Sequence, residues 1–242
     1  MQKLSSELQR LYLFGGQAYD AQAPAIDVVS ADGMVRTLVI DFHKTADEQH
    51  WLRLCDVANA LQTELGLPAP AVSVSGGECY RLWLSLAQPI AAAQASQFLA
   101  LLHKAYFEDE QIDLGRSTVE LPPCLHKPTG LWAAFINPGM GGALAEDLGL
   151  EMPPNDNAQA AFLERLNSIS AEEYAQALAT LHRKHEAAAN ALAAVVAPTP
   201  AAAARNATTP AELLLKDATL EDIVRHLHAM GIEPTFRHVL KN

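Results

Sequence analysis

Short segments that alternate between apolar and polar positions recur through the first part of the chain. Residues 35 to 42 and 79 to 86 alternate in this way, and a β-branched run at residues 72 to 74 precedes the second segment. Period-two alternation is typical of β-strands, because successive side chains point to opposite faces of a sheet. The sequence therefore predicts strands in these segments and in three others: residues 25 to 30, 118 to 121 and 131 to 136.

Glycine-containing turns separate neighbouring strands. Asp32 and Gly33 predict a hairpin turn, because Asp-Gly supplies the positive φ angles that such turns need, and the two strands beside it are expected to be antiparallel. Ser75, Gly76 and Gly77 predict a flexible, polar turn between the next two strands. Glycine lets such a turn approach a ligand closely.

Two segments between the strands repeat their apolar residues with helical spacing. Six apolar side chains of residues 46 to 66 fall on one face, and Gly66 is expected to end this helix. Residues 91 to 107 predict a second helix. The order of two strands, helix, two strands, helix and two strands predicts an α+β fold, with an antiparallel or mixed sheet and helices on one face.

The pattern becomes helical in the second half of the chain. Ser170 and Glu173 form a predicted capping box that opens an Ala-rich helix ending near residue 194. An Ala/Pro-rich stretch has the composition of a linker, and two short helices are expected beyond it. Four segments result: a sheet domain at 1–140, a helical extension at 141–196, a linker at 197–208 and a small helical tail at 209–242.

Composition and charge narrow the classes of protein that fit. The 242 residues are 50% hydrophobic, which is enough for a full core. The net charge of −11 argues against strong autonomous binding of duplex nucleic acid, which normally needs a basic surface. It leaves open a local basic groove, or a partner that brings the nucleic acid.

No membrane partner and no export are expected. No apolar run reaches the roughly 18 residues of a membrane span, and the first residues contain no apolar signal core. The three cysteines are odd in number and widely spaced, which disfavours a disulfide framework and a structural zinc site. A reducing, cytoplasmic location fits these features.

The candidate chemistry lies where one strand ends in an acid and a neighbouring strand follows the Ser-Gly-Gly turn. Asp41 could bind a metal or cap the turn after its strand, and His43 could be a ligand, a base or a surface residue. Arg81 could grip a phosphate bidentately or form a salt bridge on the exposed sheet face. Trp83 could stack on a base or pack under a helix. Lys127 could meet a phosphate or remain solvated.

Three ordered motifs resemble those of the archaeo-eukaryotic primase superfamily, over roughly residues 10 to 138. In that family a strand carries an acid pair, a later strand follows a Ser-Gly turn, and a third element offers another acid before a Leu-Pro-Gly-Thr segment. The corresponding segments here are Ile40-Asp-Phe-His43, Ser75-Gly-Gly-Glu-Cys-Tyr-Arg-Leu-Trp83 and Glu120-Leu-Pro-Pro-Cys-Leu-His-Lys127. The resemblance implies an RRM-like, primase-like sheet.

The resemblance also implies a site. Its catalytic residues would be Asp41, His43 and Asp113, and Asp41 with His43 would hold Mg²⁺ or Mn²⁺. The nucleotide would contact the remaining candidates: Ser75, Gly76, Gly77, Arg81 and Lys127.

Departures from the family pattern affect the expected chemistry. His43 stands in place of the second acid, Arg81 is the nearest polar residue to the missing histidine, and Pro123-Cys124 replaces Gly-Thr. Two-metal nucleotidyl transfer needs several carboxylates, and Mg²⁺ prefers oxygen ligands. The sequence therefore predicts a protein that binds a nucleotide or nucleic acid, lacks full polymerase activity and acts in a replication or mobile-element assembly.

Two alternatives stay open. The chain could be a non-catalytic adaptor whose helical C-terminal half, with the tail at 209–242, recruits a protein partner. It could also be an active metal-dependent nucleotidyltransferase in which His43 replaces an acid.

Overall fold

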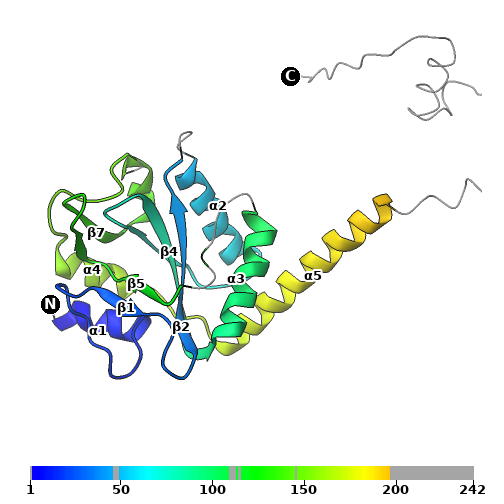
Figure 1. Cartoon of the computed structure of the whole chain (residues 1–242), viewed down its shortest axis with the longest axis horizontal. Helices are drawn as coiled ribbons and strands as arrows, with labels where there is room; N and C mark the ends of the chain where they lie inside the picture. Colours follow the sequence, from blue (N-terminus) through cyan, green and yellow to red (C-terminus); the bar gives the residue numbers. More distant parts are fainter. Residues whose placement is uncertain (1, 46–48, 109–112, 114–115, 145, 197–242) are drawn as a thin grey trace, which may run out of the picture. The chain divides into compact units, whose positions relative to one another are not determined.

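The computed structural model describes residues 2–45, 49–108, 113, 116–144 and 146–196, with side chains as far as residue 190 (Figure 1). The predicted linker and tail therefore lie outside the described residues. The strands are β1 (Ala25–Asp27), β2 (Met34–His43), β3 (Ala71–Val74), β4 (Cys79–Ala91), β5 (Thr118–Glu120), β6 (Cys124–His126) and β7 (Leu131–Ile136). The helices are α1 (Gln2–Leu11), α2 (His50–Thr63), α3 (Ala92–Tyr106), α4 (Asp156–Leu163) and α5 (Ala171–Val196), with a 3₁₀ segment at Pro138–Leu144.

A five-stranded sheet forms the centre of this fold. Its strand order is β2-β4-β3-β7-β6, and every neighbouring pair is antiparallel. The predicted α+β fold with an antiparallel sheet and flanking helices is confirmed. The even-numbered apolar residues of β2 and β4, such as Ile40 and Leu82, join one core, whereas Val39 and Trp83 join the other. The polar residues that produced the alternation, such as Asp41 and Arg81, alternate with the residues of the first core along the two strands.

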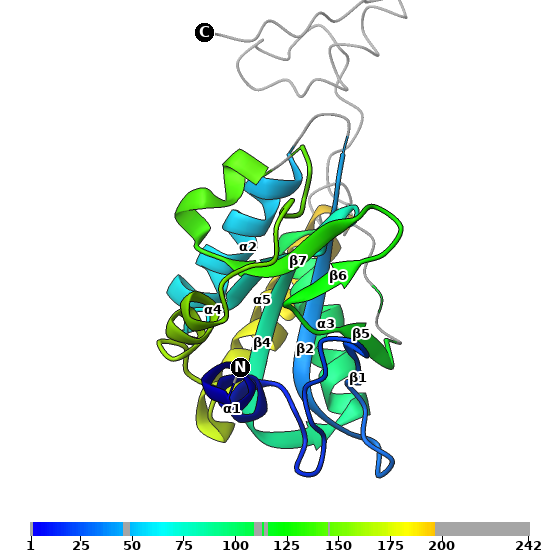
Figure 2. The ribbon, with the colours of Figure 1, turned by 90° about the vertical axis from the view of Figure 1, so that its left-hand side faces the viewer.

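Helices cover both faces of the sheet, so the prediction of helices on one face is wrong. Helices α2, α3 and the first part of α5 pack on one face, through Leu54, Phe98 and Leu181 among others. Helices α1 and α4 pack on the other, and the views in Figures 1 and 2 show the sheet between these two layers. Residues in the predicted extension at 141–196 thus contribute to the same cores as the sheet.

Strand β1 does not pair with β2, although the turn between them forms as predicted. Gly33 has a φ of +72°, and the Ser30 amide donates to the Met34 carbonyl at 2.8 Å. Only an isolated bridge between Val29 and Val35 continues this hairpin. Strand β1 instead pairs antiparallel with β5, and this two-stranded sheet covers the same face as α1. Sequence periodicity did not reveal this pairing, because β1 and β5 are far apart in the chain.

Several boundaries follow the local signals in the sequence. Strand β7 has the predicted bounds, and Gly66 follows α2 with a φ of +67°. The capping box is present: the Glu173 amide donates to Ser170 Oγ at 3.2 Å, and the Ser170 amide donates to a Glu173 carboxylate oxygen at 2.7 Å. Strand β6 and the 3₁₀ segment were not predicted.

No helix in the described part of the chain combines the length and apolar character required to cross a membrane.

Candidate functional site

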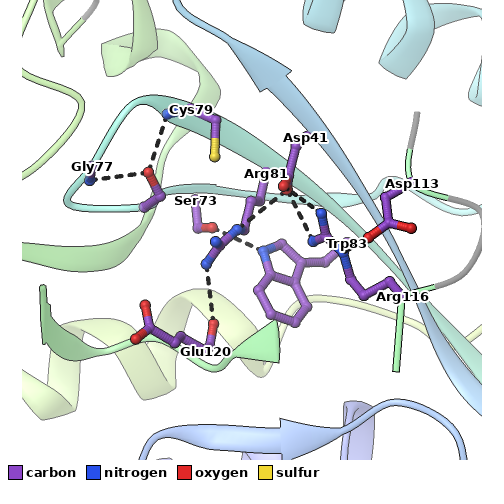
Figure 3. A network of polar contacts seen from close by, with 10 residues as sticks. Asp41, Ser73, Gly77, Cys79, Arg81, Trp83, Asp113, Arg116 and Glu120 are labelled. Carbon is purple, nitrogen blue, oxygen red and sulfur yellow. Dashed lines mark hydrogen bonds and ion pairs between the residues drawn. The ribbon is translucent and has the colours of Figure 1, made fainter. Parts of the chain in front are cut away.

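Asp41 and Arg81 face each other across two neighbouring strands. They are register partners in the β2–β4 ladder, so their side chains leave the same face of the sheet. Arg81 Nε donates a hydrogen bond to Asp41 Oδ1 at 3.2 Å (Figure 3). Arg81 Nη1 also donates to the Glu120 carbonyl oxygen at 3.3 Å, which links β4 to β5. The sequence prediction that Asp41 and Arg81 share a site is therefore consistent with the geometry.

Arg116 completes the cluster, and sequence reasoning missed this residue. Its Nη1 donates to Asp41 Oδ1 at 3.1 Å, and its Nη2 donates to Asp41 Oδ2. Arg116 Nε lies 4.0 Å from an Asp113 carboxylate oxygen. In the sequence, Arg116 is an arginine between an acidic loop and the start of a strand. This position fits a surface residue as well as a site residue, so the sequence pattern did not identify it. We call Asp41, Arg81 and Arg116 the arginine–aspartate cluster.

The arginine–aspartate cluster is largely shielded from solvent. The side chains of Asp41, Arg81 and Arg116 are only 11%, 15% and 17% exposed. Burial would raise the pKa of the Asp41 carboxyl, but the hydrogen bonds from Arg116 and the charges of both arginines hold that pKa below its ordinary value. Asp41 is therefore a carboxylate at neutral pH. Asp41 faces both arginines, and the carboxylate of Asp113 lies 4.0 Å from Arg116 Nε, so two acids stand beside the two guanidinium groups.

The sheet face that carries the cluster is covered rather than open, which corrects one expectation. The sequence alternative of a salt bridge on an exposed sheet face is wrong about the exposure, because α1, α4 and the β1–β5 pair lie over the face that carries Arg81. Trp83, two residues further along β4, is 1% exposed, and its indole N–H donates to Ser73 Oγ at 2.8 Å. The packed alternative for Trp83 is the one observed, so its ring is not accessible for base stacking.

The Ser-Gly-Gly turn joins β3 to β4 and is buried beneath the β6–β7 hairpin. Ser75 Oγ accepts from the amides of Gly77 and Cys79, at 3.1 and 3.2 Å. The Gly76 amide donates to the Leu148 carbonyl at 2.9 Å. These bonds use three amide groups that a phosphate would otherwise contact. The contribution of Ser75, Gly76 and Gly77 to nucleotide binding remains a prediction.

The other predicted site residues, His43, Asp113 and Lys127, are all exposed to solvent. His43 is two residues beyond Asp41 on the same face, exposed at the end of β2, and its proximity also lowers the Asp41 pKa. The Asp113 side chain is 59% exposed. Lys127 is exposed in the turn between β6 and β7 and takes no part in the contacts of Figure 3. The structure thus brings Asp41, Arg81 and Asp113 together through Arg116.

The described residues offer no conventional metal centre. They contain no group of three or more His, Cys, Asp or Glu side chains placed to hold an ion. Both oxygens of Asp41 already accept hydrogen bonds from arginine, and a cation there would meet two positive guanidinium groups. The donor set therefore does not fit Mg²⁺ or Mn²⁺ in this arrangement.

Two buried cysteines near the cluster lack thiolate character. Burial, together with the Asp41 charge, raises the pKa of the Cys79 thiol. Burial also raises the pKa of Cys124 to about 12. Both side chains are therefore neutral thiols at neutral pH, whereas the thiolate is the nucleophilic form of cysteine.

No protein-family model and no curated protein matches the sequence. Among solved structures, the chain is similar to the AEP domain of the primase-polymerase (PrimPol) of cyanophage S-2L, with a TM-score of 0.32 and 15% sequence identity. The match covers 54% of this chain and 61% of that domain. This similarity is too low to assign residue roles, which rest on the geometry described above.

Proposed function

We propose that this chain binds the phosphate group of a nucleotide or of a nucleic-acid strand through Arg81 and Arg116, without metal-dependent polymerisation. The observation that carries the proposal is the pair of guanidinium groups on a single shielded carboxylate. Both guanidinium groups contact this carboxylate from their own strands and keep further N–H donors, so the two together can meet one anion. Guanidinium groups form charge-assisted, geometrically specific hydrogen bonds to phosphate oxygens.

The hydrogen-bond inventory leaves donors for such a ligand. A guanidinium group has five N–H donors, and Asp41 takes two from Arg116. Arg81 directs one donor to Asp41 and one to the Glu120 carbonyl. The remaining N–H groups of both arginines can serve phosphate oxygens while Asp41 keeps the two side chains in position.

The same contacts argue against nucleotidyl transfer by a two-metal mechanism. That mechanism places cations between carboxylates and the triphosphate. Here Asp41 is engaged by arginines, and a histidine occupies the position of the family's second acid. We also propose, from the sequence resemblance to primases, that the chain acts in a replication or mobile-element assembly. The adaptor alternative depends largely on residues 209–242, outside the described part of the chain, and stays a prediction.

Calorimetric titration of the full chain with ATP and with a short single-stranded DNA, with and without Mn²⁺, tests the proposal. We expect binding that does not require the metal and that weakens at least about tenfold in Arg81→Gln and in Arg116→Gln. Arg183→Gln, at an exposed position of α5, is the matched control and should bind as the parent does.

Equal binding by all three variants would contradict the assignment of the site. Primer synthesis that disappears in Asp41→Ala would instead support the nucleotidyltransferase alternative. Circular dichroism of each variant separates loss of a contact from loss of the fold.

A further inference from the structure

A cavity lies beside the arginine–aspartate cluster, along β2. Its volume is about 190 Å³, and most of its lining is aliphatic, including Val35 and Val39 of β2 and Ala92 and Leu99 of α3. For comparison, a cavity of about 150 Å³ with an apolar lining accepts benzene. The cavity is therefore large enough for an apolar group the size of a phenyl ring.

Two side chains of opposite charge also line this cavity. Arg116 and Asp113 are the only charged residues among its described lining residues. Their atoms are 4.0 Å apart, the longest separation among the ion pairs of this region, whereas Arg81 lies 3.2 Å from Asp41. The cavity thus combines an aliphatic interior with one carboxylate and one guanidinium group, which form an ion pair at its wall.

We propose that this cavity binds a free α-amino acid with an apolar side chain. The side chain lies among the aliphatic residues, the ligand's carboxylate accepts from Arg116, and its ammonium group donates to Asp113. Each charge of the ligand then meets a protein charge of opposite sign, while Arg116 keeps its hydrogen bonds to Asp41. This site goes beyond the proposed phosphate site, because it uses the aliphatic cavity and Asp113, which phosphate binding does not require.

The chemistry of the lining argues against a nucleobase in the cavity. A base carries hydrogen-bonding groups on its edges, and these lose affinity when they are buried without partners. The Thr37 hydroxyl, one of the few polar groups of the lining, already donates to the Tyr12 carbonyl at 3.0 Å. An apolar side chain makes no such demand.

A matched set of ligands tests the proposal by calorimetric titration of the full chain. The set consists of L-phenylalanine, 3-phenylpropanoate, which lacks the ammonium group, 2-phenylethylamine, which lacks the carboxylate, and glycine, which lacks the side chain. We expect L-phenylalanine to bind with a dissociation constant of about 1 mM or lower, and each of the other three at least about tenfold more weakly.

Two variants of neighbouring residues locate the site. Ala92→Leu fills the cavity and should weaken L-phenylalanine binding at least about tenfold, because the added methylenes occupy the space of the ligand. Ala93→Leu adds the same group at an exposed position of α3 and should leave binding unchanged. Asp113→Asn should reduce the preference for L-phenylalanine over 3-phenylpropanoate.

Three results would overturn the proposal: no binding of L-phenylalanine, equal binding of 3-phenylpropanoate, or undiminished binding in Ala92→Leu. The ATP titration separates this proposal from the previous one, since Ala92→Leu leaves Arg81 and Arg116 in place and should bind ATP as the parent does. Thermal melting shows whether each variant retains its fold.

Discussion

Arg116 holds both carboxylate oxygens of Asp41 across a separation of 75 residues in the chain. The two hydrogen bonds run in parallel, which fixes the orientation of both side chains. Arg116 precedes β5, whereas Asp41 is in β2, so this pair ties the β1–β5 layer to the central sheet. Because Arg81 and Arg116 both donate to Asp41, this carboxylate holds the two guanidinium groups next to each other.

Replacing Asp41 should destabilise the fold, because two largely buried guanidinium groups would lose the carboxylate that both of them contact. Asp41→Asn is expected to lower the free energy of unfolding by about 3 kcal/mol near neutral pH, within the range for breaking one side of a buried ion pair. Urea unfolding measures this change. Asp32→Asn, at an exposed turn position, controls for the loss of a negative charge and should have little effect.

The contribution of Asp41 should also depend on pH. Its pKa in the folded chain is below the ordinary value, so in acid the unfolded chain binds the proton more readily. The stabilisation is complete above about pH 4, the unfolded range, and is lost as pH falls through the folded pKa. Stability curves against pH should therefore decline less steeply in acid for Asp41→Asn than for the parent. Parallel curves would contradict the assignment of this carboxylate.

Gly76 should tolerate no side chain. Its φ is +72°, and a Cβ atom there would lie 2.8 Å from the Cβ of His126 and 2.9 Å from the Leu131 carbonyl oxygen. Gly76→Ala is expected to cost about 2 kcal/mol or more. Gly77→Ala is the matched comparison and should cost less, because the three atoms nearest to its new Cβ belong to the His126 ring, at 3.2 Å and beyond. Denaturant unfolding of the two variants decides the order.

The Ser73–Trp83 hydrogen bond should be measurable as a pairwise coupling. Ser73→Ala leaves the buried indole N–H without its partner and is expected to cost about 1–3 kcal/mol. In a Trp83→Phe background the same change should cost less, since no indole N–H remains. A double-mutant cycle by urea unfolding gives the coupling energy, and a value near zero would contradict the bond.

Removing the cap of α5 should cost less than these core changes. Ser170→Ala deletes the hydroxyl that accepts from the Glu173 amide and is expected to lower the free energy of unfolding by about 1 kcal/mol. Ser170→Asp should retain most of the stability, because aspartate also caps helix N-termini. Thermal unfolding compares the two, and equal losses would indicate that the cap is not the cause.

The sequence by itself determined the elements that local chemistry controls. The apolar segment at residues 131 to 136 predicted β7, the Ser-Gly-Gly segment predicted the turn between β3 and β4, and Ser170 with Glu173 predicted the start of α5. Each depends on residues close together in the chain, whose backbone preferences and hydrogen bonds act over a few positions.

Only the tertiary structure decided what surrounds Asp41. Strand register placed Arg81 opposite it across 40 residues, and the pairing of β1 with β5 brought Arg116 to its carboxylate. These contacts depend on how distant segments pack. A shift of one residue in strand register would move every side chain of the strand to the opposite face of the sheet. The sequence identified Asp41 and Arg81 as candidates, but packing alone turned a predicted metal ligand into the counter-charge of two arginines.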